Sequence, residues 1–318
     1  IPVFNSYEDL SKYILNEKEE AFHVKGKELA LHLLQKEQNI REAVHAICYE
    51  AFVDKVVYME FTCCPLLHTK YHKPEEVLEF ICDECNKFNE THEIKVKVVL
   101  NANLARLSRL DTQKIAELCV SFKEKGVIAF TTTTGEIEED AMKYYESTFD
   151  YLQQNFVPIT IFAGENTASS VTCALYRGHA RRISGGFKVV KSENLLNDVT
   201  SHNISILVNG SSQRMENAIT GWNKSPSRFL FDFGVRLAFC SIHHTFTNMT
   251  RSQQLFNLAQ TSGFDALNIM TIIDNSFASI NMHYKITNEY QKMFWNESLR
   301  ILKENGFKNT MNCSYFQE

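Results

Sequence analysis

The sequence predicts an α/β protein, a (β/α)₈ barrel of the TIM type whose first strand is absent or degenerate. Short β-branched and aromatic runs alternate with amphipathic helical segments along most of the 318 residues. This alternation is typical of parallel strands joined by helical crossovers. No Gly-, Ser- or Pro-rich linker interrupts it, which indicates one domain over residues 1–318. The pattern yields seven strands, one fewer than a closed barrel needs.

Residues 1–55 are mainly helical in pattern, with helices predicted over 7–15, 27–35 and 39–53 and a weak strand candidate at 21–24. Residues 56–245 hold the strand–helix repeats. Their strands are predicted at 56–61, 94–100, 127–130, 158–162, 182–184, 204–208 and 235–240. The helices between them are predicted at 74–88, 111–125, 138–156, 168–178 and 192–200. Residues 246–318 follow as C-terminal helices, predicted at 253–261, 264–275 and 285–305.

The composition argues against nucleic acid and membrane partners. Lys and Arg number 33 against 38 Asp and Glu, a net charge of −5, so the chain lacks the basic excess that anionic partners attract. No apolar run approaches the ~18 residues of a membrane span. Nine scattered cysteines indicate reduced thiols and a cytoplasmic protein. The start at Ile1 has neither a signal-peptide pattern nor an initiator Met, so we expect a processed product or part of a longer chain.

Polar and glycine residues follow the predicted strands, at the end of a barrel where active sites lie. In chain order these segments are Thr62-Cys63-Cys64-Pro65, Asn101 with Asn103, Thr131 to Glu136, Phe162-Ala163-Gly164-Glu165, Ser184-Gly185-Gly186, Asn209-Gly210-Ser211-Ser212 and Ser241-Ile242-His243-His244. These segments contain the candidate functional residues of the chain.

The order and spacing of these segments resemble the adenosine deaminase family over nearly the whole chain. Phe162-Ala163-Gly164-Glu165 stands where the family has His-Ala-Gly-Glu, and Arg182 to Gly186 where it has Arg-Leu/Ile-Gly-His-Gly. Ser211-Ser212 resembles the pair that ends its next strand. Ile242-His243-His244 occupies the place of Thr-Asp-Asp, and Thr131 to Glu136 that of Asp-Leu-Ala-Gly-Asp-Glu.

The resemblance implies a zinc site, and the departures from the family pattern fall on its ligands. The family binds Zn²⁺ through a His-x-His pair on the first strand, the His of His-Ala-Gly-Glu and the first Asp of Asp-Asp. Here that strand is absent or lies before Ile1, Phe162 replaces the third ligand and His243 the fourth. In this sequence Gly185 replaces the His that positions the water in the family. A phenyl ring cannot ligate zinc, and without the metal no water is activated.

We therefore expect a catalytically inactive member of this family, without a cofactor, that serves as a binding or scaffolding subunit of a protein assembly. Its partner is either another protein or a weakly bound purine nucleoside. Glu165 is the one candidate catalytic residue; it either still hydrogen-bonds a purine ring nitrogen or is a leftover polar residue. The candidate substrate-binding residues are Gly135, Gly164, Gly185, His243 and His244. The alternative is an active zinc-dependent purine nucleoside or nucleotide deaminase, with zinc as its cofactor and a His-x-His pair upstream.

Three other patterns receive a structural interpretation. His243 and His244 could join Glu165 around a metal, but neighbours on a strand face opposite sides, so fewer than three protein ligands converge. Cys82-Asp83-Glu84-Cys85 lies inside a predicted helix, which favours buried thiols over a zinc or redox pair. Ser184-Gly185-Gly186 with Lys188 is looser than a phosphate-binding loop.

Overall fold

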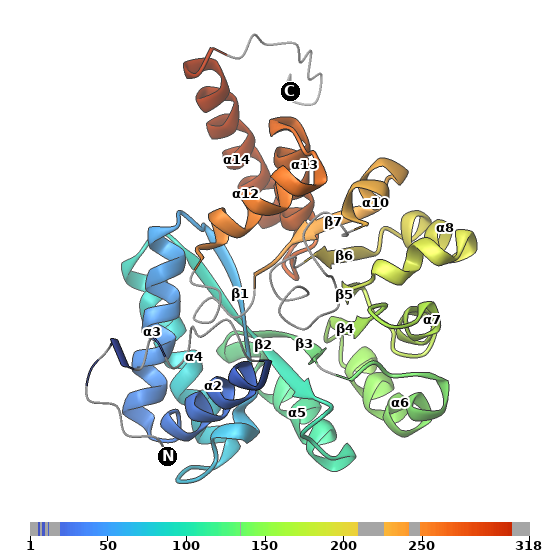
Figure 1. The fold of residues 1–318 in the computed structure, drawn as a ribbon. Helices are drawn as coiled ribbons and strands as arrows, with labels where there is room; N and C mark the ends of the chain where they lie inside the picture. Colours follow the sequence, from blue (N-terminus) through green and yellow to red (C-terminus); the bar gives the residue numbers. More distant parts are fainter. Residues whose placement is uncertain are drawn as a thin grey trace.

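A single parallel sheet forms the centre of the molecule. The computed structural model describes residues 20–133, 135–208, 226–241 and 249–306, besides isolated positions before residue 20. Seven strands pair in the order β1 to β7, each neighbour parallel to the next. They are β1 (Tyr58–Cys63), β2 (Lys95–Asn103), β3 (Val127–Thr133), β4 (Ile159–Ala163), β5 (Arg182–Gly185), β6 (Ser205–Val208) and β7 (Arg236–Phe239). Figure 1 shows this curled sheet surrounded by helices, which confirms the barrel-type fold.

Helices precede, connect and follow the strands. The first described are α2 (Glu20–Leu33) and α3 (Glu37–Val53). The segments between strands contain η1 (Pro65–His68), α4 (Pro74–Thr91), α5 (Arg109–Ser121), η2 (Lys123–Lys125), α6 (Glu139–Gln154), α7 (Ala168–Tyr176), η3 (Phe187–Lys191), α8 (Glu193–Ser201) and α10 (Ser227–Phe233). After β7 come α12 (Arg251–Ser262), α13 (Ala266–Ala278) and α14 (Tyr284–Glu304).

The structure differs from the predicted elements in several places, including β2, which ends at Asn103 and not at 100. Residues 21–24, the weak strand candidate, lie within α2, since four residues carry too little pattern to separate strand from helix. β3 continues to Thr133, three residues beyond the predicted end at 130, because threonine is β-branched and fits a pleated strand. Most of the helix predicted at 7–15 falls outside the described residues.

The helices begin where their sequences supply caps. Ser108 accepts a hydrogen bond from the Asp111 backbone N–H at the start of α5, and Thr250 accepts one from Gln253 at the start of α12. Pro74 occupies the first turn of α4, where its missing N–H costs nothing. These caps satisfy N–H groups that a helix cannot pair internally. They fix the residues at which α5 and α12 begin.

The apolar core lies between the sheet and the surrounding helices. On β3, Phe130 is fully buried and meets Phe149 of α6 edge-to-face, with ring centroids 6.2 Å apart. On β4, Ile161 points toward α7, because a Cβ built on Gly178 would lie 2.3 Å from its Cδ1. Successive side chains of a strand alternate between faces. The neighbours of Ile161, including Phe162, therefore lie on the opposite face, which is the inner face of the curled sheet.

A buried ion pair links distant strands inside the sheet. Glu60 of β1 accepts a hydrogen bond from the Arg182 guanidinium of β5 at 2.7 Å, with side-chain exposures of 13% and 9% respectively. The Arg182 Nε donates to the Thr160 hydroxyl at 2.9 Å. Glu60 also accepts the Asn281 backbone N–H at 3.0 Å. The pair thus joins β1, β4 and β5 to the turn between α13 and α14.

The C-terminal helices pack beside the last strand. The Phe239 backbone N–H of β7 donates to the Ser276 hydroxyl of α13 at 3.2 Å, and α14 extends away from the sheet in Figure 1. Thr287 is the buried residue of α14. Among the described helices, none has both the length and the apolar character needed to cross a membrane.

We expect Glu60→Ala to lower the free energy of unfolding by about 3–5 kcal/mol, because it leaves the Arg182 charge buried without its counterion. Denaturant unfolding followed by circular dichroism measures the change. Arg300→Ala is the matched control, since Arg300 pairs with Glu297 and Glu304 on the exposed face of α14 and should leave stability unchanged. Equal stability of the two variants would contradict the role assigned to the Glu60–Arg182 pair.

Candidate functional site at the strand ends

The carboxyl-terminal ends of β2 to β5 bring polar and glycine residues to one edge of the sheet. On β2 and β3, the Thr133 hydroxyl donates to Asn101 Oδ1 at 2.9 Å. On β4 and β5, the register places Phe162 beside Ser184 and Ala163 beside Gly185. Parallel pairing therefore assembles the predicted segments on the side where barrel enzymes carry their active sites.

Gly164 and Gly186 allow the ends of β4 and β5 to approach closely. Gly164 has φ +78°, and a Cβ built on it would lie 2.6 Å from Val171 Cγ2 and 2.7 Å from Gly186 Cα. The Gly186 N–H donates to Ala163 O at 2.8 Å, and the Lys188 N–H donates to Gly164 O at 2.7 Å. These N–H groups already have partners, which argues against an anion site at Ser184 to Lys188.

Glu165 lies over Gly185. Gly185 has φ +95°, and a Cβ built on it would lie 2.4 Å from Glu165 Oε1. The Glu165 carboxylate therefore occupies the space that a side chain at position 185 would need. Three predicted site residues, Gly164, Glu165 and Gly185, are brought together. Gly135 lies in the loop after β3, exposed and with φ +87°. His243 and His244 lie outside the described residues.

Glu136, which sequence reasoning placed only within a loop segment, anchors the loop that carries Glu165. Its Oε1 accepts the backbone N–H groups of Glu165 at 2.5 Å and Asn166 at 2.8 Å. Its Oε2 accepts the Ser170 hydroxyl at 2.9 Å. A carboxylate is favourable at this place because it accepts backbone N–H groups close to the N-terminus of α7. In the sequence, Glu136 is only a glutamate that follows a glycine after a strand. This pattern does not indicate its hydrogen-bond partners.

Phe162 is the half-buried side chain of the inner face at the end of β4. Its backbone N–H donates to the Thr132 hydroxyl at 3.1 Å. Over the described parts of the chain, no group of three or more His, Cys, Asp or Glu side chains lies close enough to hold a metal ion. Phe162 thus presents an aromatic ring, not a metal donor, to the inside of the sheet.

The Cys-x-x-Cys segment is structural, as predicted. Cys82 and Cys85 lie on α4 with 1% and 2% of their surface exposed, and burial raises the pKa of Cys82 to about 12. A thiol with so high a pKa carries almost no thiolate near neutral pH and is a weak nucleophile. The cysteines in the described part of the chain are all free thiols.

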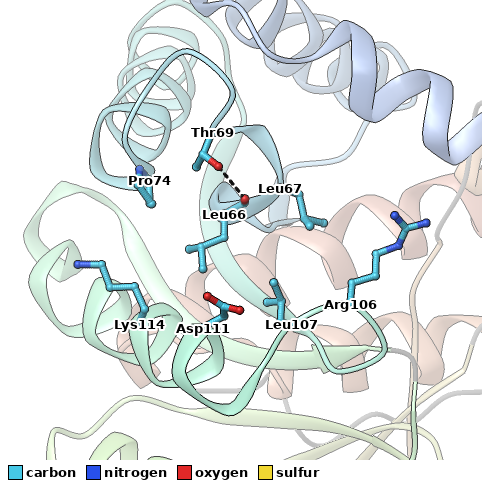
Figure 2. Close-up of a pocket in the computed structure, with 8 residues that line it drawn as sticks. All are labelled: Leu66, Leu67, Thr69, Pro74, Arg106, Leu107, Asp111 and Lys114. Atoms are coloured by element: carbon cyan, nitrogen blue, oxygen red, sulfur yellow. Dashed lines mark hydrogen bonds between the residues drawn. The ribbon is translucent and has the colours of Figure 1, made fainter. Parts of the chain in front are cut away.

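A surface pocket of about 480 Å³ lies beside this edge, between η1 and the start of α5. Figure 2 shows its lining, in which Leu66 and Leu67 of η1 lie opposite Leu107, which precedes α5. Asp111 is used by the α5 cap and Lys114 pairs with Glu75 at 2.6 Å. No predicted site residue lines this pocket, so it is separate from the Glu165 site.

The fold and its polar strand ends define an α/β barrel protein of the TIM type. A family model described as "Adenosine deaminase" matches residues 7–293, so the chain belongs to the adenosine deaminase family. This confirms the resemblance found in the sequence.

Relatives in sequence agree with that assignment, and solved structures agree with the fold. A probable adenosine deaminase of Dictyostelium discoideum is 26% identical over 86% of this chain, which spans only 36% of that protein. An adenosine deaminase of Clostridium acetobutylicum is 24% identical over 78% of this chain and 74% of its own length. The structure of adenine deaminase from Arthrobacter aurescens superposes with a TM-score of 0.81 at 14% identity, covering 95% of this chain and 91% of the other. The N6-mAMP deaminase of arabidopsis gives 0.78 at 13% identity, with 92% and 89% covered.

We expect Gly164→Ala to lower the free energy of unfolding by about 3 kcal/mol, adding a backbone cost of ~1–2 kcal/mol at positive φ to overpacking against Gly186. Gly263→Ala is the control: Gly263 has φ +66° and open space around its Cβ, so only the backbone cost applies. Denaturant unfolding of both variants measures the difference. If both substitutions lowered the free energy of unfolding equally, the close approach of β4 and β5 would contribute nothing to the cost of Gly164→Ala.

Proposed function

We propose that this chain is an adenosine-deaminase-like protein that has lost zinc ligands, does not catalyse deamination, and acts as a binding or scaffolding subunit of a protein assembly. It retains weak purine nucleoside binding at Glu165. The observation that carries the proposal is Phe162, which faces the inside of the sheet at the place where the family has a zinc-binding His. Phenylalanine offers no lone pair to a metal, and the described residues do not fit a zinc ion.

Gly185 gives independent support. Its position matches the family's water-positioning His, and the Glu165 carboxylate fills the space where that imidazole would begin. A histidine at 185 would therefore require Glu165 to move. The arrangement suits a site in which a carboxylate contacts a ligand directly, without an imidazole beside it.

The scaffolding part of the proposal rests on exposed aromatic surface. Phe229 and Phe233 of α10 stack with centroids 6.1 Å apart while 52% and 38% of their surfaces are exposed. On the C-terminal helices, Leu267, Met293 and Ile301 are also more than 40% exposed. An exposed aromatic pair such as Phe229 and Phe233 is the kind of apolar surface that protein–protein contacts bury. A partner that covers these helices would bury it.

Metal content and turnover separate this proposal from the alternative, an active zinc-dependent purine deaminase. We expect the purified full-length protein to hold no stoichiometric zinc by elemental analysis. We also expect no ultraviolet absorbance change with adenosine, with or without added zinc. Glu165→Gln is the control, since conversion equal in the two proteins would come from a contaminating enzyme. Stoichiometric zinc together with conversion that Glu165→Gln abolishes would overturn the proposal.

The purine contact is tested separately with inosine, which cannot be deaminated. An ionised Glu165 accepts a hydrogen bond from the ring N–H of inosine, and such charge-assisted bonds contribute ~1.5–3 kcal/mol. We therefore expect Glu165→Gln to weaken inosine binding about tenfold in calorimetric titration. Glu124→Gln, in the exposed turn η2, should leave the affinity unchanged. Equal inosine affinity of the wild type and both variants would show that Glu165 does not contact the purine.

A further inference from the structure

We propose that Glu136 is a positioning residue, whose carboxylate sets the orientation of Glu165 at the strand ends. The inference rests on the proposed purine contact of Glu165 and extends it to a residue on a different strand connection. Glu136 follows β3 and Glu165 follows β4, so the interaction joins two neighbouring loops.

The first step is direct contact with the backbone of Glu165. The 2.5 Å bond from the Glu165 N–H to Glu136 Oε1 is reinforced by the Asn166 N–H on the same oxygen at 2.8 Å. Two successive backbone N–H groups thus share one oxygen of the Glu136 side chain. Glu136 therefore holds the peptide plane from which the Glu165 side chain departs.

The second step is a bond that holds the other side of the same loop. Ser170 is buried, and its hydroxyl lies 2.9 Å from Glu136 Oε2. The same hydroxyl oxygen accepts the Gly164 N–H at 2.9 Å. Glu136 thus acts on the residue before Glu165 through Ser170, and on Glu165 itself directly. The Ser170 hydroxyl also lies 2.9 Å from Thr167 O, so Glu136 shares the Gly164 side of the loop with a backbone carbonyl but holds the Glu165 and Asn166 N–H groups itself.

The third step is the position of the Glu165 carboxylate against its neighbours. Its Oε1 lies against Gly185, with the close backbone approach of Gly164 and Gly186 next to it. A small rotation of the 164–165 peptide would move the carboxylate off Gly185. Positional errors of about 1 Å are enough to weaken a directed hydrogen bond strongly. Anchoring by Glu136 is what keeps the carboxylate in one place.

Glu138 offers a matched control two residues away. Its Oε1 accepts the Thr167 hydroxyl at 3.0 Å, so it contacts the same loop but neither Glu165 nor Gly164. A general loss of loop order would follow from either substitution. Loss of the Glu165 orientation alone would follow only from changes at Glu136.

The experiment compares Glu136→Ala, Glu138→Ala, Glu165→Gln and the double variant Glu136→Ala/Glu165→Gln in the full chain. We expect Glu136→Ala to weaken inosine binding about tenfold and Glu138→Ala to change it less than twofold. The double variant should bind no more weakly than Glu165→Gln alone, because a residue that acts through Glu165 has nothing left to position. Additive losses in the double variant would overturn the proposal.

A second measurement decides the question without a ligand. The NMR signal of the Glu165 side-chain carboxyl carbon, assigned by its loss in Glu165→Gln, should move in Glu136→Ala and stay in place in Glu138→Ala. If the wild-type protein binds no inosine, the purine contact fails while this signal still tests the positioning role. A signal unmoved by Glu136→Ala would overturn that role.

Discussion

The close approach of the ends of β4 and β5 is the constraint on which the candidate site depends. Gly164 and Gly186 have no side chains, so their backbones meet at a distance that a Cβ would forbid. The approach places Glu165 of one strand end directly over Gly185 of the next. The rest of the site, including the Glu136 anchor, is arranged around this contact. Any larger residue at 164 would separate the strand ends and with them Glu165 and Gly185.

Polar interactions serve different purposes at the two ends of the sheet. At the strand starts, Arg182 and Glu60 form a buried pair that the turn after α13 helps to satisfy. A buried charge is tolerable there because Thr160, Ser279 and Asn281 supply further hydrogen bonds to the pair. At the strand ends, the Glu136 carboxylate accepts hydrogen bonds from the backbone of a neighbouring loop. One network holds strands that are distant in sequence together, and the other holds a single loop in a single conformation.

Much of the fold followed from periodicity, and part of the site followed from motif order. The strands at 94–100 and 158–162 were predicted to within a few residues because continuous β-branched runs have few alternative structures. Gly164, Glu165 and Gly185 were named because their segments follow strands and resemble the family's motifs in order and spacing. The Glu136 contacts could not be predicted, because they join main-chain groups that every residue possesses. The Glu60–Arg182 pair likewise depends on strand curvature, which no local pattern encodes.

The sequence by itself determined the alternation of strands and helices and the residue types at each strand end, including a phenylalanine where the family has a zinc-binding histidine. These properties are local, since they depend on side-chain chemistry and on spacing along the chain. Only the tertiary structure decided that the Glu165 carboxylate fills the space over Gly185, and that Glu136 holds the loop in place. Such contacts depend on distances between segments about 20 to 30 residues apart, and backbone packing sets those distances rather than composition.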